Sequence, residues 1–233
     1  MGYDIVAYCS KNYADTLALV LPNWIKSDAS SIHIYTDWSV KTNHPKVTYH
    51  HLFSQTTNFG KNCMRKAEAI LLHMMKVGTQ SQQPILALDL DCYICKDLDQ
   101  IFNEFLDVAV TVNPKVSFNI QLRNVVGGVV FLQRTQQSIR FIQEWVFEQT
   151  TMNNPPPCHD QASLSTIAKK QRPGVIARLS INLFNSHPFT NSPGEIADWI
   201  YRIQKYQPSI LHFASGTWKS GTLMKQALGI IHG

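Results

Sequence analysis

Four consecutive apolar residues, Ile85 to Leu88, place the strongest limit on how this chain can fold. An uninterrupted apolar run of this length between polar residues is typical of a strand that is covered on both faces in a parallel sheet. Parallel strands need crossover helices, and amphipathic segments follow the apolar runs along this chain. The sequence therefore predicts an α/β sandwich, with helices on both faces of a mostly parallel central sheet.

The predicted strands and helices alternate along the chain. Strands are expected at residues 5–8, 31–36, 85–88, 108–112, 129–132, 175–179 and 209–213. Helices are expected at residues 13–25, 61–77 and 160–170, from about residue 135, and from Pro193 after a Ser192 capping box. Pro22 is expected to kink or break the first helix, and Asp99 to cap a short helix over residues 100–105. Without an internal repeat or a linker-like segment, residues 1–233 are expected to form a single domain.

The composition excludes several classes of protein. With 44% hydrophobic and 16% charged residues, the chain is neither disordered nor a coiled coil. Its longest apolar stretch, Val125 to Leu132, is far shorter than the roughly 20 residues that a membrane-spanning helix needs. The N-terminus lacks a basic, apolar leader, and the five cysteines are too few and too scattered for a disulfide framework. We therefore expect a cytoplasmic protein with reduced thiols and no transmembrane segment.

The net charge of +5 and the pI near 8.9 favour an anionic partner. That partner can be a phosphorylated small molecule, a nucleic acid or an acidic membrane surface. The lysines and arginines are scattered, and the aromatic signature of RNA-binding sheets is missing, so we do not expect nucleic-acid binding. A peripheral association with a membrane is compatible with the charge, and a non-enzymatic module that binds RNA or an anionic surface remains an alternative.

Two carboxylates, Asp89 and Asp91, directly follow the buried strand. Carboxylate oxygens bind hard divalent cations, and open α/β sheets bind ligands at the carboxyl ends of their strands. His212 closes a later apolar strand and is either a third metal ligand or a hydrogen-bonded core residue. Cys92 and Cys95, with Cys158 and His159, suggest zinc instead, but structural zinc sites usually have two closely spaced cysteine pairs.

Several short segments are similar, in order along the chain, to the motifs of one enzyme family. They are Asn12-Tyr13-Ala14, Arg65, Leu86 to Asp91, Gly127-Gly128-Val129, Asp160-Gln161, and His212 followed by Gly216 and Lys219. On these segments the chain resembles the nucleotide-sugar-dependent glycosyltransferases of the GT-A fold, and most closely the glycogenin-like and lipopolysaccharide galactosyltransferase-like family 8 group. Two positions differ: Val126 stands where the family has asparagine, with Asn124 two residues earlier, and Ser220 replaces a proline.

The resemblance implies a Rossmann-like GT-A domain that uses a metal to move a hexosyl group from a nucleoside-diphosphate sugar, with UDP-sugar the expected donor. The acceptor is expected to be a glycan or another hydroxyl compound, and the anomeric configuration to be retained. Inversion is the alternative, and it would need Asp160 as a base for the acceptor hydroxyl. A mixed carboxylate and imidazole shell suits Mn²⁺ somewhat better than Mg²⁺.

The resemblance also assigns site residues. The implied metal ligands are Asp89, Asp91 and His212, and the implied catalytic residues are Asp160 and Gln161. The implied donor contacts are Tyr8, Asn12, Tyr13, Asp37, Arg65, Asp89, Leu90, Gly216 and Lys219. Asn124, Gly127 and Gly128 are implied on the acceptor side.

Some of these assignments have structural alternatives. Tyr13 can stack on a base or pack against its own helix, Asp37 can be a turn residue, and Asp160 can cap a helix. A sugar nucleotidyltransferase is the main enzymatic alternative. It would need a glycine-rich, basic triphosphate loop after the first strand, and the loop from Cys9 to Asn12 contains no glycine.

Overall fold

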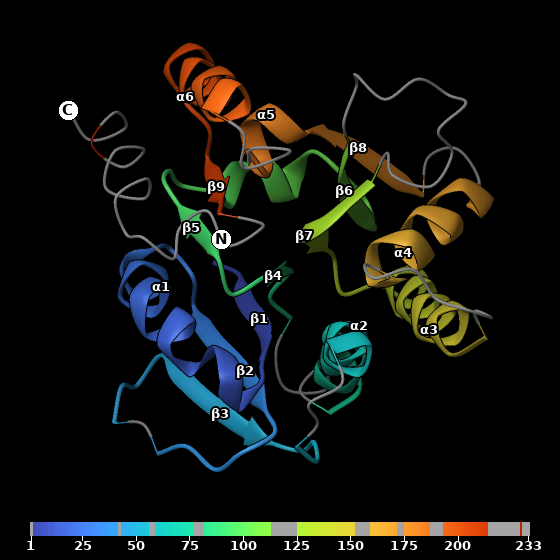
Figure 1. Ribbon diagram of the computed structural model, residues 1–233. Helices are drawn as coiled ribbons and strands as arrows, with labels where there is room; N and C mark the ends of the chain where they lie inside the picture. The colour runs from blue at the N-terminus through green and yellow to red at the C-terminus, as the bar shows by residue number, and fades with distance from the viewer. Residues whose placement is uncertain are drawn as a thin grey trace.

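The computed structural model describes residues 2–41, 43–55, 59–76, 82–112, 125–151, 159–171, 175–186, 193–213 and 229, with no side-chain description for residues 59–61, 76 and 159 (Figure 1). Its centre is a seven-stranded sheet with strand order β3-β2-β1-β4-β7-β6-β8. The strands are β1 (Asp4–Cys9), β2 (Ser31–Thr36), β3 (Val47–His51), β4 (Ile85–Leu88), β6 (Val108–Val112), β7 (Val125–Leu132) and β8 (Ile176–Ser180). Within this sheet β7 runs antiparallel to both of its neighbours, and the other pairs are parallel.

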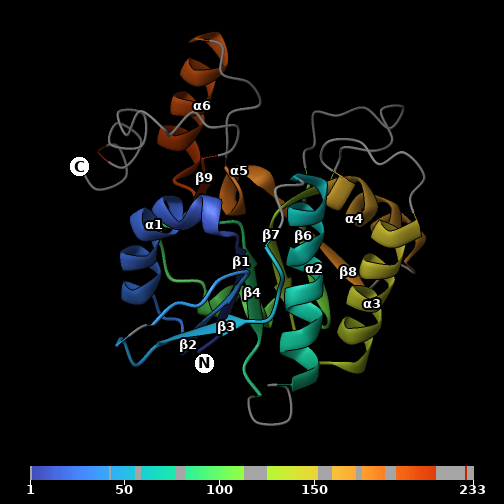
Figure 2. The same cartoon turned by 60° about the horizontal axis from the view of Figure 1, so that its bottom comes forward.

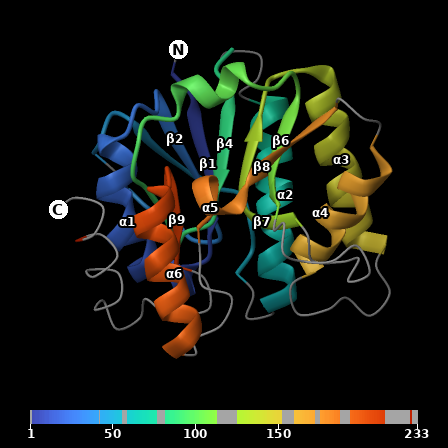
Figure 3. The same ribbon diagram turned by 90° about the horizontal axis from the view of Figure 1, so that it is seen from above.

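Helices cover both faces of the sheet (Figures 2 and 3). They are α1 (Ala14–Lys26), α2 (Phe59–Lys76), α3 (Gln136–Thr151), α4 (His159–Lys170), α5 (Ile181–Phe184) and α6 (Pro193–Tyr206), with 3₁₀ helices η1 (Lys11–Tyr13) and η2 (Asp99–Asn103). Leu17 and Trp24 of α1 pack on one face, and Ile70, Phe141 and Leu164 from α2, α3 and α4 pack on the other. The predicted α/β sandwich is therefore confirmed. None of the helices in the described ranges combines the length and the apolar character needed to span a bilayer.

A small second sheet positions the C-terminal part of the described chain. It pairs β5 (Cys92–Ile94) antiparallel with β9 (Ile210–His212), so the predicted strand at 209–213 lies outside the central sheet. The pairing sets Cys92 opposite His212 and continues in a hydrogen bond from Phe213 N to Asp91 O, 2.8 Å long. The predicted strand and the predicted metal motif therefore meet.

Pro22 does not end the first helix, contrary to the break that we considered. A proline inside a helix removes one backbone hydrogen bond and clashes with the preceding turn, which together cost about 3 kcal/mol. Contacts beyond the proline offset this cost. Asn23 exchanges two hydrogen bonds of 2.8 Å with the backbone of Ile94. The buried Trp24 donates from Nε1 to Cys92 O at 2.9 Å. These contacts hold the end of α1 against β5.

Two other local predictions were wrong. Asp99 is the first residue of η2 rather than its cap, and Asp97 Oδ1 accepts the hydrogen bond from Asp99 N at 2.7 Å. A carboxylate two residues earlier can reach that N–H group in the manner of an Asx turn. Strand β7 begins at Val125 rather than at residue 129, because Gly127 and Gly128 belong to an irregular part of the strand instead of a turn before it.

A buried polar cluster lies between the sheet and α2, at the amino ends of β1 and β2. Arg134 donates from one nitrogen to Asp4 Oδ2 at 2.8 Å and to His73 Nε2 at 2.9 Å. Ser31 donates to Asp4 Oδ1, so its oxygen accepts from His33 Nε2, and His33 Nδ1 then accepts from His50 Nε2 at 3.0 Å. Each of these three histidines therefore fits the network as a neutral ring.

We expect this cluster to make the fold sensitive to acid. Burial, followed by the neighbouring His73, lowers the pKa of His33 to about 4, and burial also lowers the pKa of His73. Because the ordinary histidine pKa is near 6.5, the folded state binds fewer protons, and stability is lost as the pH falls from 6.5 toward 4. His33 alone should contribute a loss of roughly 2 kcal/mol by about pH 5. Urea unfolding at about pH 7.5 and pH 5 measures this loss of unfolding free energy.

The control is His51→Gln, which changes an exposed histidine of β3. This variant should keep the pH dependence of the wild type, whereas His33→Gln should reduce it. Equal unfolding free energies of the wild type at the two pH values would contradict the prediction.

Candidate active site

The strand order places the site between the carboxyl ends of β1 and β4. From β1 the chain proceeds outward through β2 and β3, then crosses back to form β4 on the other side of β1. Ligands of open α/β sheets bind at such a switch point. Tyr8 lies near the end of β1, and Asp89 directly follows β4.

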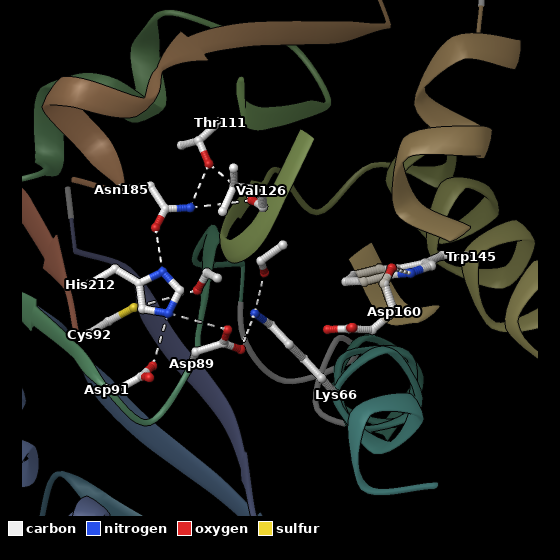
Figure 4. A network of polar contacts seen from close by, with 12 residues as sticks. Lys66, Asp89, Asp91, Cys92, Thr111, Val126, Trp145, Asp160, Asn185 and His212 are labelled. Carbon is white, nitrogen blue, oxygen red and sulfur yellow. Dashed lines mark hydrogen bonds and ion pairs between the residues drawn. The ribbon is translucent and has the colours of Figure 1, made fainter. Parts of the chain in front are cut away.

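Asp89, Asp91 and His212 converge at this switch point (Figure 4). His212 Nε2 lies 3.0 Å from Asp91 Oδ1 and 3.7 Å from Asp89 Oδ2. The histidine side chain is only 7% exposed, whereas those of Asp89 and Asp91 are 35% and 23% exposed. The two carboxylates are therefore open to a ligand, and the imidazole behind them is buried.

The charges of this group depend on one another. Burial opposes the charged form of His212, but Asp91 and then Asp89 outweigh it and raise the pKa of the imidazole. Burial likewise acts to raise the pKa of Asp91, and His212 with Lys66 reverses that effect and lowers it. Without a cation, Asp91 therefore carries its negative charge beside a His212 ring that is protonated on both nitrogens.

Gly128 and Asn185 enclose the ring of His212. A Cβ atom on Gly128 would lie 2.4 Å from Cε1 and 2.6 Å from Nδ1 of the ring, so only glycine leaves it room. His212 Nδ1 also lies 2.8 Å from Oδ1 of the fully buried Asn185. The position of the ring is therefore set from both sides.

An irregular segment of β7 supplies backbone acceptors to the site. The register between β6 and β7 shifts after Val110, so that Thr111 pairs with Val126. The carbonyl of Gly127 accepts from Lys66 Nζ, and the carbonyl of Gly128 accepts from Asp89 N at 2.9 Å. Bulges of this kind are frequent beside active sites.

Lys66 is a functional candidate that the sequence reasoning missed. Its nearly buried amine donates to Asp89 Oδ1 at 2.7 Å and to the carbonyl of Gly127. The sequence pattern of α2 could have identified it, because Ile70 and Met74 form an apolar face of this helix and Lys66 and His73 lie on the same face. A lysine on a buried helix face needs an anionic partner.

Asp160 and Gln161 lie in the first turn of α4, which begins at His159, so Asp160 is not the residue before the helix. A Cβ atom on Gly127 would lie 3.8 Å from both Asp160 Oδ2 and Gln161 Cα. Trp145 Nε1 donates to the backbone oxygen of Asp160 at 3.0 Å and fixes the start of the helix. Both residues therefore lie beside the glycines of β7, and Figure 4 shows the Asp160 carboxylate on the side of Lys66.

The residues expected to contact the nucleoside lie at the ends of β1 and β2 and on α2. The Tyr8 hydroxyl donates to Asn62 Oδ1 at 3.1 Å, and the Tyr8 ring packs edge-on against Phe53. The Arg65 guanidinium lies 4.5 Å from the centre of the Phe53 ring. Tyr8 and Arg65 thus share one aromatic neighbour that the sequence reasoning did not name.

The loop after β1 is tied to the end of β2, because Lys11 N donates to Asp37 Oδ1 at 2.8 Å. Asn12 and Tyr13 follow on η1, and Tyr13 is 41% exposed, so its ring is not a core residue. Leu90 packs against the apolar cluster under α1. Asn124, Gly216 and Lys219 lie outside the described residues.

A second group of possible metal ligands, Asp4, His33 and His73, does not fit a cation. Arg134 donates to both Asp4 and His73 and already brings a positive charge to this position. A metal ion would have to displace a guanidinium that is nearly buried. Among the described residues, the group that combines possible metal ligands with exposed carboxylates is therefore the one at the end of β4.

A mostly parallel sheet with paired carboxylates at its switch point places the protein among the Rossmann-like α/β folds that bind ligands at this edge. A sequence model of the nucleotide-diphospho-sugar transferases matches residues 24–225, and the chain belongs to this family. Its enzyme class is therefore that of a glycosyltransferase.

Two further comparisons bear on the fold and on close relatives. The fold is similar to the crystal structure of a glycosyltransferase involved in the glycosylation of the major capsid of PBCV-1, with a TM-score of 0.61, 10% sequence identity and 99% of each chain covered. No curated protein sequence matched the chain.

Proposed function

We propose that this glycosyltransferase uses a divalent cation, with Mn²⁺ preferred over Mg²⁺. With it, the enzyme transfers a hexosyl group from a UDP-sugar to a glycan or another hydroxyl acceptor, with retention of configuration. The observation that carries the proposal is the convergence of Asp89, Asp91 and His212 at the carboxyl end of β4. The finer assignment to the glycogenin-like family 8 group rests on the ordered sequence motifs.

The residues present fit such a cation. Two ligands at right angles around a metal with bonds of about 2.1 Å lie about 3.0 Å apart, and His212 Nε2 lies 3.0 Å from Asp91 Oδ1. Cys92 is adjacent, but burial raises the pKa of its thiol and its Sγ–H group donates to Gly128 O at 3.6 Å. The ligand set is therefore oxygen and imidazole nitrogen, which suits Mn²⁺. When bound, the cation supplies positive charge that offsets the charge of the departing diphosphate.

The chain's own residues bind and orient the two substrates. Lys66 holds the Asp89 carboxylate and the β7 backbone in place, and we assign Asp160 and Gln161 to the sugar side of the site because they adjoin Gly127. The donor contacts that we assign are Tyr8, Asn12, Tyr13, Asp37, Arg65, Leu90, Gly216 and Lys219. The acceptor contacts that we assign are Asn124, Gly127 and Gly128, with Gly128 acting through its backbone because its Cα faces the ring of His212.

We further propose that residues 1–233 act as one catalytic domain in the cytoplasm. Strands from the first and the second half of the described chain share the seven-stranded sheet, which supports one domain. Cys9, Cys63, Cys92 and Cys95 are free thiols, which is compatible with a reducing compartment.

A thermal-shift panel of UDP-, GDP- and CMP-sugars, with and without Mn²⁺, tests the proposed function. A ligand at about 100 times its Kd stabilises the folded state by about 2.7 kcal/mol. We expect a UDP-sugar to raise the Tm by several degrees with Mn²⁺ and by much less with EDTA. Equal shifts in EDTA would contradict the metal dependence, and a larger shift with a GDP- or CMP-sugar would contradict the donor.

A further inference from the structure

The amide of Asn185 has a defined orientation. Asn185 is fully buried after α5, and its Nδ2 atom lies 2.7 Å from Thr111 Oγ1 and 3.3 Å from Val126 O. A carbonyl only accepts hydrogen bonds, and Thr111 uses its own proton to donate to Val126 O at 3.0 Å. Both partners therefore require the NH₂ end of the amide, and the oxygen end is turned toward His212.

This orientation determines where His212 carries a proton. Asn185 Oδ1 lies 2.8 Å from His212 Nδ1, and an amide oxygen only accepts. Nδ1 must therefore donate. Nε2 faces Asp91 and Asp89, whose oxygens also only accept, so without a cation both ring nitrogens donate. Because Asn185 holds the proton on Nδ1, the proton that leaves when a cation binds is the one on Nε2.

The irregular segment of β7 makes the hydrogen bonds of Asn185 possible. The register shift brings Thr111 opposite Val126, so the hydroxyl of Thr111 and the amide of Asn185 can both reach the Val126 carbonyl. Histidines that bind metals usually donate their second N–H group to a nearby acceptor, and removal of that acceptor typically weakens metal binding 10- to 100-fold.

We propose that Asn185 is a positioning residue that holds the proton of His212 on Nδ1, so that Nε2, beside Asp89 and Asp91, is the nitrogen left to bind a cation. The inference rests on the proposed function only where it concerns metal affinity. The hydrogen bond from Nδ1 to Asn185 is a property of the protein without metal and can be measured independently.

The first experiment compares Asn185→Leu with Asn182→Leu. Asn182 lies on α5, just before Asn185, and contacts Arg202, so its replacement removes a polar side chain without touching His212. We expect Asn185→Leu to weaken Mn²⁺ binding, measured by calorimetry, by about 10- to 100-fold. Asn182→Leu should keep the affinity of the wild type. Wild-type Mn²⁺ affinity in folded Asn185→Leu would overturn the inference.

The second experiment detects the Nδ1–H group of His212 by nitrogen-15 NMR of labelled histidine in the protein without metal. The wild type should show an Nδ1–H proton that exchanges slowly with water, and Asn185→Leu should lose this slow exchange. A rapidly exchanging or absent Nδ1–H group in the wild type would overturn the inference. If the wild type bound no Mn²⁺, the proposed function would fail, and this measurement would still decide the role of Asn185.

Thr111→Val is the variant to measure if Asn185→Leu does not fold. It keeps Asn185 and removes the acceptor at 2.7 Å, leaving the longer bond to Val126 O. We expect a smaller loss of Mn²⁺ affinity in the same direction, with faster exchange of the Nδ1–H proton than in the wild type. An unchanged exchange rate and an unchanged affinity in this variant would count against the inference.

Discussion

Asp91→Asn is expected to lower the rate of sugar transfer by at least about 100-fold, which corresponds to about 2.7 kcal/mol of lost transition-state stabilisation. The substitution preserves the size of the side chain and removes its charge. It also leaves the backbone hydrogen bond from Phe213 N to Asp91 O in place, so the fold should persist. Transfer assays at saturating Mn²⁺ and calorimetry of UDP binding with Mn²⁺ measure the effect, and both signals should be lost together.

The matched control is Asp97→Asn. Asp97 begins the second Asp-x-Asp pair of the chain, is exposed, and accepts a local hydrogen bond from Asp99 N. Its replacement should cost at most about 1 kcal/mol of stability and leave transfer close to that of the wild type. Normal UDP binding and turnover by Asp91→Asn would rule out the role that we assign to Asp91.

Gly128→Ala is expected to weaken metal binding and to destabilise the fold. The added Cβ would overlap the ring of His212, at 2.4 Å from Cε1, and the ring cannot easily move because Asn185 and the pairing with Cys92 hold it. Overpacking of this kind typically costs about 1–3 kcal/mol. For a chain of this size that lowers the Tm by roughly 2–12 °C. Mn²⁺ affinity should fall by at least about tenfold, because Nε2 leaves the carboxylates.

The adjacent glycine provides the control. A Cβ atom on Gly127 would meet its nearest neighbours at 3.8 Å, which is ordinary van der Waals contact. Gly127→Ala should therefore keep its thermal stability within about 0.5 kcal/mol of the wild type and bind Mn²⁺ normally. Calorimetry and thermal unfolding of the two variants in parallel make the comparison. Similar behaviour of the two variants would show that the ring of His212 is not confined as the structure indicates.

Local patterns in the sequence were sufficient to predict the α/β sandwich. The apolar run from Ile85 to Leu88 predicted a buried parallel strand, and the structure places it between β1 and β7 in the sheet. Strand β3 was missed because four of its five residues are polar or aromatic and it lies at the sheet edge, where little apolar burial is needed. Strand β5 was missed because three residues carry almost no periodic signal.

The candidate site was predictable to a different extent for each residue. Asp89 and Asp91 follow a strand in the sequence, so their place at the sheet edge could be inferred from the residues. Lys66 could have been noticed as a charge on an apolar helix face. Asn185 and Thr111 carry no such signal, because an asparagine or a threonine beside an apolar segment is ordinary in any sequence.

The sequence by itself determined the class of fold and the carboxylate pair, because strand burial and the residues that end a strand are local properties. Only the tertiary structure decided that His212 faces that pair, that Gly128 leaves room for its ring and that Asn185 orients it. These three residues come from separate elements, and the small sheet of β5 with β9 and the irregular segment of β7 bring them together. Contacts of that kind depend on long-range packing, which leaves no pattern in the neighbouring sequence.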